Sequence, residues 1–413
     1  MVTEPAEAGG ARRVLVLANR LPFPVDDGWK ARTFHVIRAL ARNASVTLLV
    51  FDDSPAGSGD AFRAAVGCSL DIVRVPPPPS HTPLQLILGL ITSTPLYVWN
   101  MRSRAYAREL RRLLAEREPD DIVVVLASMY PYLLALPREA RRIVDTHNID
   151  SILLERYATT LRSVPRRWYA AATIRKLRRL ERRVFADADL VWVCSPREPD
   201  LVRRIAPSAC VAAVPNGVDT TTLAPVADVV PQPARLLFFG RLDYQPNRDG
   251  IEYFVREILP LLRAREPRVE VHVAGVGSDA ALERLASETP ELRLVGRVAD
   301  IRREIAAAAV VVVPLRLGGG TRLKILEALA VGAAVVSTTI GAEGLDLQSG
   351  RELMLADSPA DFARAVSGLL RDRSARERLG ARGRMTVRQH YDWDHVEREM
   401  ALQLGWRSPS PAA

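Results

Sequence analysis

The sequence predicts an α/β protein made of two Rossmann-like domains, each with a parallel β-sheet covered by helices. Three observations lead to this fold class. Short apolar runs alternate with amphipathic helical patterns along the chain. Most of these runs are continuously apolar, as expected for parallel strands that are buried on both faces. The chain has 413 residues, 48% of them hydrophobic, which is enough for two domains with sizeable cores.

Five apolar runs in the first half of the chain are expected as strands. The first is followed by a loop through Asp27 and Gly28 and then by a helix over Ala31–Ala41. Helical patterns also lie between the later strands. The expected strands are Val14–Ala18, Ser45–Phe51, Ile122–Ala127, Arg142–Thr146 and Leu190–Cys194.

The second half repeats this alternation. Its expected strands are Leu236–Phe239, Val269–Ala274, Leu292–Val295, Val310–Val313 and Ala334–Thr338. Its expected helices include Gly250–Arg265, Ala280–Ser287 and Ile301–Ala308. We therefore predict one domain over residues 1–214 and a second over 215–390, then a helix over 391–407 that packs back toward the first domain, and a disordered tail over 408–413.

A glycine-rich loop after Val310–Val313 has the composition of an anion-binding site. It reads Gly318, Gly319, Gly320, Thr321 and Arg322. Glycine lets an anion approach the backbone, and the unpaired N–H groups of a helix N-terminus favour negative charge. Lys324 adds a cation to this end, where the helix dipole by itself disfavours one. Glu327, one turn later, is placed to accept hydrogen bonds from a ribose diol.

An ordinary strand-to-helix turn stays open as the alternative interpretation of this loop. Thr321 would then be the N-cap of the helix, and Glu327 would be a solvated helix residue.

Parallel sheets bind ligands beyond the carboxyl ends of their strands, so residues that directly follow strands are the main functional candidates. Those of the first domain are Asp27, Gly28, Lys30, His147 and Asn148. Those of the second domain are Gly240, Arg241 and the glycine-rich loop. At two positions a structural role is the alternative to a functional one. Asn148 would be the N-cap of the next helix, and Arg32 would be a residue of the helix surface.

The formal net charge of +9 restricts the classes of partner. Much of the positive charge lies between Arg162 and Arg183, in an amphipathic helix with a basic face. Such a face is either solvated or in contact with anionic lipid, and both interpretations stay open. Nucleic acid is not expected as a partner, because the chain has neither a zinc module nor a basic sheet motif interleaved with aromatic residues.

Neither a disulfide framework nor a membrane span is expected. Cys68, Cys194 and Cys210 form no Cys-x-x-Cys pair. The apolar run from Pro83 to Trp99 is broken by polar residues and is shorter than the roughly twenty residues of a membrane helix. The N-terminal segment lacks the apolar core of a secretory signal. We therefore expect a cytoplasmic protein, with peripheral contact at the inner face of the membrane as the open variant.

Several of these segments resemble the motifs of family 4 retaining glycosyltransferases, which have the GT-B fold. The matching segments are Asp26–Arg32, Asp145–Asn148, Pro215–Asp219, Phe239–Leu242 and Gly320–Ala328. They follow one another in the order and at the distances of that family and span nearly the whole chain. The resemblance implies two Rossmann-like domains whose parallel sheets face an interdomain cleft.

The resemblance also implies transfer of a sugar from a nucleoside-diphosphate sugar to an acceptor hydroxyl, with retention at the anomeric carbon. The acceptor would be a saccharide, a lipid-linked molecule or a secondary metabolite. The first domain would bind it near Asp27, Gly28, Lys30 and Asn148. The expected catalytic residues are His147, Arg241 and Lys324. The expected donor-binding residues are Gly240, Gly318, Gly319, Gly320, Thr321, Arg322 and Glu327.

Two positions depart from the pattern of that family. Its Glu-x7-Glu pair is reduced to Glu327, because the first position is Gly319. The family often has Arg followed six residues later by Lys at the diphosphate, whereas this chain has Arg241 followed by Asn247. Lys324 and Arg322 are the expected replacements for the missing charge.

No metal or other cofactor is expected. The two Asp-x-Asp segments, Asp187–Asp189 and Asp392–Asp394, are predicted to lie before a strand and at the start of the C-terminal helix, away from the ligand edge. Two alternatives to a transferase stay open. One is a catalytically silent basic binding protein of the GT-B fold, and the other is a GT-B phosphorylase or epimerase.

Overall fold

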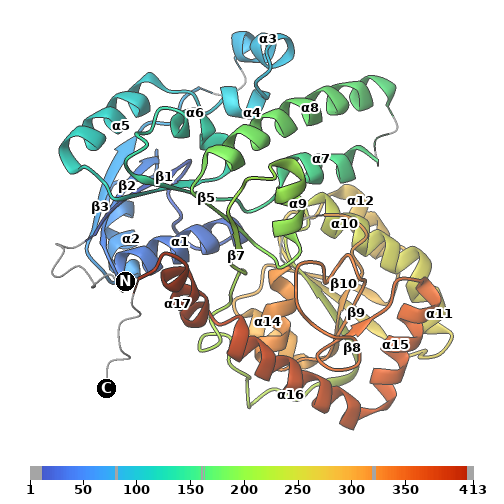
Figure 1. Ribbon diagram of the computed structural model, residues 1–413. Coiled ribbons are helices and arrows are strands. Elements are labelled where there is room, and N and C mark those ends of the chain that lie inside the picture. The colour runs from blue at the N-terminus through green and yellow to red at the C-terminus, as the bar shows by residue number, and fades with distance from the viewer. Residues whose placement is uncertain (1–11, 80–81, 160, 162, 319–321, 407–413) are drawn as a thin grey trace, which may run out of the picture. The chain divides into compact units, whose positions relative to one another are not determined.

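The structure is a computed structural model that describes residues 12–79, 82–159, 161, 163–318 and 322–406. The chain folds into two compact units, each with its own parallel sheet and core (Figure 1). The first unit comprises residues 1–214 together with 397–413, and the second comprises 215–396. The predicted tail over 408–413 lies outside the described residues.

The sheet of the first unit has seven strands in the order β3-β2-β1-β4-β5-β6-β7, all parallel. The order reverses between β1 and β4, where Val14 pairs with Val46 on one side and Asp121 on the other. This reversal is the topological switch point, where doubly wound sheets bind ligands. The strands are β1 Arg13–Ala18, β2 Ser45–Phe51, β3 Leu70–Val75, β4 Asp121–Val125, β5 Arg141–Asp145, β6 Leu190–Val193 and β7 Val211–Ala213.

Helices connect these strands, as parallel pairing requires. They are α1 Gly28–Ala41, α2 Ser58–Val66, α3 Pro83–Ile91, α4 Leu96–Trp99, α5 Arg104–Arg117, η1 Ala127–Met129, α6 Tyr130–Leu133, α7 Asp150–Ala158, α8 Val164–Asp187 and α9 Glu198–Ile205. The C-terminal helix α17, Trp393–Gln403, is bonded to α1 through Glu397. The Glu397 carboxylate accepts hydrogen bonds of 2.7 Å from both Arg38 and Arg42 and lies 2.6 Å from His35 Nδ1.

The sheet of the second unit has six parallel strands in the order β10-β9-β8-β11-β12-β13. Its switch point lies between β8 and β11. The strands are β8 Gln232–Phe239, β9 Glu270–Ala274, β10 Leu292–Gly296, β11 Ala308–Val313, β12 Val335–Ser337 and β13 Met354–Leu355. The helices are α10 Gln245–Tyr253, η2 Phe254–Ile258, α11 Leu259–Arg263, α12 Ala280–Ser287, α13 Ile301–Ala307, α14 Leu323–Val331, α15 Pro359–Arg371 and α16 Arg373–His390.

The predicted α/β class with two parallel sheets is confirmed. Every residue of β4 and of β11 is buried, because helices cover both faces of each sheet. The sequence did not predict β3, β7 and β13. The first of these contains two charged residues, Asp71 and Arg74, and the other two are only three and two residues long.

The helix predicted over Gly250–Arg265 is wrong in its details. It begins earlier, at Gln245, and contains a π-helical segment, η2, before it continues as α11. Pro260 lies in the first turn of α11 and supplies no backbone N–H, so the regular ladder of hydrogen bonds cannot pass through this position.

Candidate functional site

The switch point of the second unit brings together several of the residues selected from the sequence. Gly240 and Arg241 directly follow β8, and the loop that leaves β11 leads to α14. Arg322 occupies the N-cap position of α14. Gly319, Gly320 and Thr321 lie outside the described residues, so their predicted contacts stay predictions.

Lys324 lies in the first turn of α14 and is held by two neighbours. Its Nζ donates a hydrogen bond of 2.6 Å to Oδ1 of Asn247, and it lies 4.2 Å from the centre of the Phe238 ring. The ring and the amide fix the ammonium group at the end of β8. The hydrogen bond between Asn247 and Lys324 was not predicted from the sequence.

Asn247 connects this lysine to the turn after β8. Its Nδ2 donates a hydrogen bond of 2.6 Å to the carbonyl oxygen of Arg241. Gly240 has a φ of +139°, and a Cβ there would come within 3.1 Å of Asn247 Nδ2 and of Lys324 Nζ. The position therefore requires glycine for its backbone conformation, and a side chain would crowd the lysine.

The charges around Lys324 shift its titration. Burial lowers the pKa of Lys324 to about 7, the nearby charge of Arg322 acts in the same direction, and Glu327 opposes the shift. Burial also raises the pKa of Glu327, and Lys324 opposes that shift. The ammonium group of Lys324 is thus incompletely solvated, which favours binding of an anionic ligand beside it.

Two arginines complete the described part of this site. Arg322 is buried, and its guanidinium packs against Gly318, where a Cβ would lie 2.5 Å from Nη2. Arg241 is exposed and pairs with Asp243 through Nη2 and Oδ2 at 2.5 Å. Of the two cations near the end of β8, Arg241 is therefore solvated and Lys324 is partly buried.

In the first unit, His147 is the end of a buried polar chain. His147 Nε2 lies 3.1 Å from Asp145 Oδ2, and Arg32 binds the same carboxylate through Nη2 at 2.6 Å and Nε at 2.9 Å. Arg32 Nη1 also donates to the carbonyl oxygen of Val214 at 2.8 Å. The expectation that Arg32 lies on the helix surface is wrong, because this side chain is fully buried.

This chain determines the state of the histidine. Burial lowers the pKa of His147 and Asp145 opposes the shift, so the imidazole is neutral at pH 7. Burial acts to raise the pKa of Asp145, but the charge of Arg32 and the hydrogen bond to His147 outweigh it and lower the pKa to about 2. A neutral imidazole that donates Nε2–H to this carboxylate presents Nδ1 as an acceptor for a ligand hydroxyl.

The other residues selected in the first unit have structural contacts. Asp27 is the N-cap of α1 and accepts a hydrogen bond of 2.7 Å from Lys30 N. Gly28 is the first residue of that helix. The Lys30 Nζ pairs with Asp26 at 2.7 Å. Asn148 was expected to be the N-cap of α7, but Ile149 occupies that position. The carbonyl oxygen of Asn148 accepts a hydrogen bond of 2.6 Å from Thr146.

Sequence reasoning missed the residues that follow β4. Leu126, with a φ of +72°, turns the chain at the switch point, and Ser128 and Tyr130 follow it. Both side chains are buried, and among the described residues neither hydroxyl has a hydrogen-bond partner. Buried hydroxyls without partners are rare, so these two groups distinguish the loop after β4. The rule that selected His147 would also have selected this loop.

A pair of carboxyl groups lies close to the same edge. Tyr97 donates a hydrogen bond of 3.0 Å to Asp150, the first residue of α7, and Ser151 N donates one of 2.9 Å to Glu181 of α8. Burial raises the pKa of Asp150 to about 6 and that of Glu181 to about 7. These groups extend the polar surroundings of Tyr130.

The two Asp-x-Asp segments have other partners. Asp187 pairs with Arg138 and Arg142, each at 3.0 Å, and Asp392 accepts a hydrogen bond from Thr220. Within the described ranges there is no group of three or more His, Cys, Asp or Glu side chains arranged to hold a metal ion.

Two family models match consecutive parts of the chain. The one described as "Glycosyl transferase 4-like domain" matches residues 27–217, and the one described as "Glycosyl transferases group 1" matches residues 233–372. Together with the two parallel sheets, these matches define a protein of the GT-B class. The chain belongs to the family 4 glycosyltransferases.

Curated relatives match parts of the chain. The phosphatidyl-myo-inositol mannosyltransferase of Mycolicibacterium smegmatis is 33% identical over 195 residues, which cover 45% of this chain and 50% of that protein. The glycogen synthase of Mycobacterium tuberculosis is 27% identical over 266 residues, which cover 59% of this chain and 62% of that protein. The chain thus spans about half the length of the curated relatives that it matches.

Solved structures share the fold over most of the chain. Anabaena HepE in complex with UDP has a TM-score of 0.66 at 14% identity and covers 95% of this chain and 99% of its own. Sucrose-phosphate synthase from Thermosynechococcus elongatus has a TM-score of 0.68 at 20% identity. The match covers 95% of this chain and 98% of that chain. At such identities the similarity establishes the fold.

Proposed function

We propose that this protein is a retaining glycosyltransferase that moves a sugar from a nucleoside-diphosphate sugar to an acceptor hydroxyl. The observation that carries the proposal is the partly buried ammonium group of Lys324, held by Asn247 at the N-terminus of α14. A cation whose pKa is lowered to about 7 is stabilised by an anion, and a diphosphate supplies one. HepE, which shares the fold, binds UDP and UDP-glucose, and a donor of this kind fits the site.

The described residues suggest how such a donor binds. Lys324, Arg241 and the N-terminus of α14 would neutralise the diphosphate. Glu327, one turn into α14, would accept hydrogen bonds from the two ribose hydroxyls. These cationic groups stabilise the departing phosphate most strongly, because negative charge grows there as the bond breaks.

The transfer itself needs no protein nucleophile. The bond between the anomeric carbon and the phosphate oxygen breaks through a transition state that resembles an oxocarbenium ion. The acceptor oxygen forms its bond on the same face of the sugar and gives its proton to the departing phosphate. Neutral His147 would accept a hydrogen bond from a donor-sugar hydroxyl at Nδ1, with Asp145 and Arg32 keeping the ring in place.

Replacing Glu327 by alanine is expected to abolish selective nucleotide binding, because the variant lacks the acceptor for the ribose diol. Calorimetric titration with UDP, GDP and ADP measures this and also identifies the base. Glu283→Ala on α12 is the control, since this glutamate is exposed. A folded wild type that binds no nucleotide would contradict the proposal and favour a silent binding protein. Release of sugar phosphate by inorganic phosphate would indicate a phosphorylase, and epimer formation without an acceptor would indicate an epimerase.

Replacing Tyr130 by phenylalanine is expected to raise the free energy of unfolding by about 1 kcal/mol, because the variant no longer buries an unpaired hydroxyl. We expect it to lower transfer to the acceptor and to leave nucleotide binding unchanged. Tyr132→Phe is the matched control. Tyr132 accepts a hydrogen bond from Ser103 N at 2.9 Å and donates one to Met101 O at 2.7 Å, so its loss should destabilise the unit. Unchanged transfer in Tyr130→Phe would contradict a role in acceptor binding, and a loss of stability equal to that of Tyr132→Phe would contradict the unpaired hydroxyl.

Transfer is expected to proceed without a divalent metal, because cationic side chains and a helix N-terminus supply the positive charge at the diphosphate. Initial rates in EDTA and after addition of manganese or magnesium test this. Activity lost in EDTA and restored by a metal would show that the side chains do not suffice.

A further inference from the structure

We propose that one surface of the first unit binds the anionic surface of a lipid bilayer. This α3–α8 surface consists of Leu84, Ile87 and Ile91 of α3 together with Val164, Trp168, Arg175, Arg179 and Arg182 of α8. The inference concerns membrane contact and does not depend on the proposed transfer reaction.

Helix α3 presents an apolar stripe to solvent. Leu84, Ile87 and Ile91 are spaced at i, i+3 and i+7, so they share one face of the helix, and they are 64%, 53% and 75% exposed. The helix contains no charged residue. Its other side packs on α4, where a Cβ on Gly89 would come within 2.9 Å of Leu96. Such a concentrated exposed apolar stripe marks an interaction surface.

Helix α8 carries the charge beside this stripe. It has eight basic residues and two acidic ones, and one of the acids, Glu181, is buried. Val164, Trp168, Arg175, Arg179 and Arg182 lie on one side of the helix, opposite the buried stripe of Ala170, Ile174 and Leu177. Trp168 is 71% exposed. Within the described residues, no carboxylate pairs with Arg175, Arg179 or Arg182.

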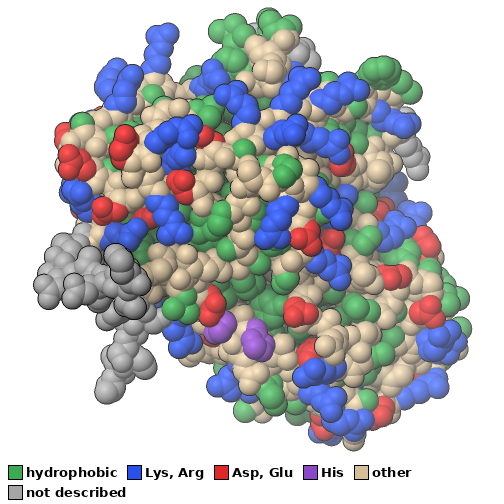
Figure 2. All heavy atoms as spheres, viewed as in Figure 1, with side chains coloured by type: hydrophobic (Ala, Val, Ile, Leu, Met, Phe, Trp, Pro, Cys, Tyr) green, Lys and Arg blue, Asp and Glu red, His purple; other side chains and the backbone are tan. Residues whose placement is uncertain are grey.

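The two helices form one continuous surface. Lys176 of α8 donates a hydrogen bond of 2.7 Å from Nζ to the carbonyl oxygen of Gly89 in α3. Figure 2 shows the hydrophobic side chains of α3 at the top of the view and Lys and Arg side chains over α8 next to them. Apolar and basic side chains therefore face solvent together, without intervening acidic residues from α8.

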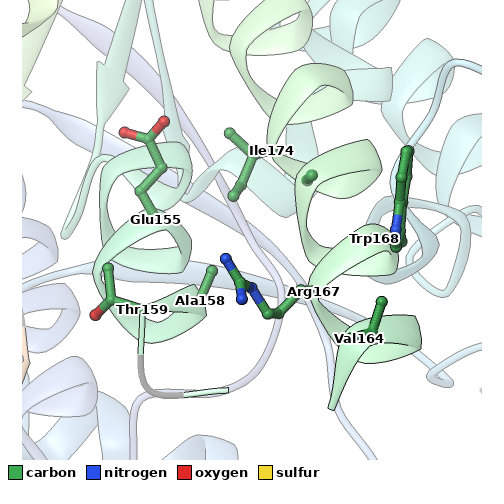
Figure 3. Close-up of a pocket in the computed structure, with 8 residues that line it drawn as sticks. Glu155, Ala158, Thr159, Val164, Arg167, Trp168 and Ile174 are labelled. Atoms are coloured by element: carbon green, nitrogen blue, oxygen red, sulfur yellow. The ribbon is translucent and has the colours of Figure 1, made fainter. Parts of the chain in front are cut away.

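A recess next to Trp168 enlarges the apolar part of this surface. It has a volume of about 590 Å³ and lies between α7 and α8, lined in part by Ala158, Val164 and Ile174. Arg167 reaches from α8 toward α7 in this recess (Figure 3). The recess offers apolar walls beside the Arg167 guanidinium, which suits a lipid acyl chain and its phosphate, and the carboxylate of Glu155, which also lines it, pairs with Arg178.

The chemistry of the surface favours a bilayer over a protein partner. Arginines attract anionic headgroups, and aliphatic side chains and tryptophan enter the boundary between headgroups and acyl chains. The nine residues of α3 suffice to lie in that boundary. None of the helices in the described ranges is both long and apolar enough to cross a bilayer, so the contact is peripheral.

Flotation of the full-length protein with vesicles tests the proposal. We expect binding to vesicles of phosphatidylcholine with about 30 mol% phosphatidylglycerol, weak or no binding to phosphatidylcholine alone, and a steep loss of binding as salt rises above about 0.1 M. Tryptophan emission should shift to shorter wavelength on binding. Most of that shift should be lost in Trp168→Phe, which separates insertion from charge adsorption.

Two sets of substitutions test the parts separately. Replacing Arg175, Arg179 and Arg182 by glutamine should lower the partition coefficient roughly a hundredfold, about fivefold for each arginine. The control replaces Arg104, Arg108 and Arg111 of α5, which are exposed and have the same spacing and charge, and it should change binding less than about threefold. Serine at positions 84, 87 and 91 should lower binding at least about tenfold.

Three results would overturn the proposal. One is no binding of the wild type to either kind of vesicle, which would leave the surface to a protein partner. The second is an equal loss in the α5 control, which would show that only the net charge matters. The third is unchanged binding in both surface variants.

Discussion

The variant Lys324→Met is expected to lose turnover and gain stability. We expect kcat/KM to fall by about 10²–10³-fold, the cost of removing one well-placed group that stabilises developing negative charge. The methionine side chain has a similar length and can pack on the Phe238 ring, so the loss should come from charge rather than from a cavity. Arg378→Met, an exposed cation of the same unit, is the control for kinetics. Wild-type turnover in Lys324→Met would remove this residue from the mechanism.

The gain in stability has a defined dependence on pH. The pKa of Lys324 is lowered from 10.5 to about 7 in the folded chain, so the unfolded chain binds more protons between these values. The cost of burying the ammonium group is therefore full below pH 7 and disappears as pH rises toward 10.5. Urea unfolding should show the variant more stable than the wild type by at least about 1 kcal/mol at pH 6.5, and this advantage should be lost near pH 10.5. A constant difference would contradict the lowered pKa.

The same group should couple donor binding to protons. A bound diphosphate is expected to raise the pKa of Lys324. Above pH 7 the wild-type protein should therefore bind a fraction of a proton for each nucleotide that it binds. Calorimetry in two buffers of different ionisation heat measures this uptake. The variant Lys324→Met should bind the nucleotide without this proton uptake.

The variant Asp145→Asn is expected to lose about 3–5 kcal/mol of unfolding free energy, because it leaves the fully buried guanidinium of Arg32 without its carboxylate. The double variant Arg32→Met/Asp145→Leu should recover much of this loss, since it buries neither charge. Asp60→Asn is the control, because its ion pair with Arg63 is on the surface and contributes at most about 1 kcal/mol. Urea unfolding measures the unfolding free energy of these three variants against that of the wild type.

The pH dependence of this pair has the opposite sign to that of Lys324. The pKa of Asp145 is lowered from 3.8 to about 2, so its stabilisation is complete above 3.8 and is lost as pH falls through 2. The deficit of Asp145→Asn should therefore be constant at neutral pH and shrink in acid. A deficit that stays constant down to pH 2 would show that the hydrogen bonds, and not the charge, provide the stabilisation.

Local patterns sufficed to predict most elements of the fold. The strand over Ser45–Phe51 and the helix over Ala280–Ser287 have the predicted bounds, because each is a segment whose apolar pattern and flanking residues agree. The short edge strands β7 and β13 were not predicted. A segment of two or three residues has no period of its own, and only its pairing with β6 or β12 defines it.

The site shows the same division. Glycines and basic residues after β8 and β11 were selected from the sequence, because the carboxyl ends of parallel strands meet at one edge. The strand order places them at the switch point of the second unit. The roles assigned to His147, Arg241 and Glu327 stay predictions. The sequence did not show that Asn247, 77 positions away, holds Lys324, or that Arg32 reaches Asp145 across 113 positions.

The sequence by itself determined the α/β class, the two-part organisation of strands and helices and the family motifs. These features depend on neighbouring residues and on the periodicity of side chains along one element. Only the tertiary structure decided which charges are buried and which side chains hold them. Burial and pairing are properties of positions brought together from distant parts of the chain, and they determine that Lys324 titrates near neutrality while Arg32 stays charged in the core.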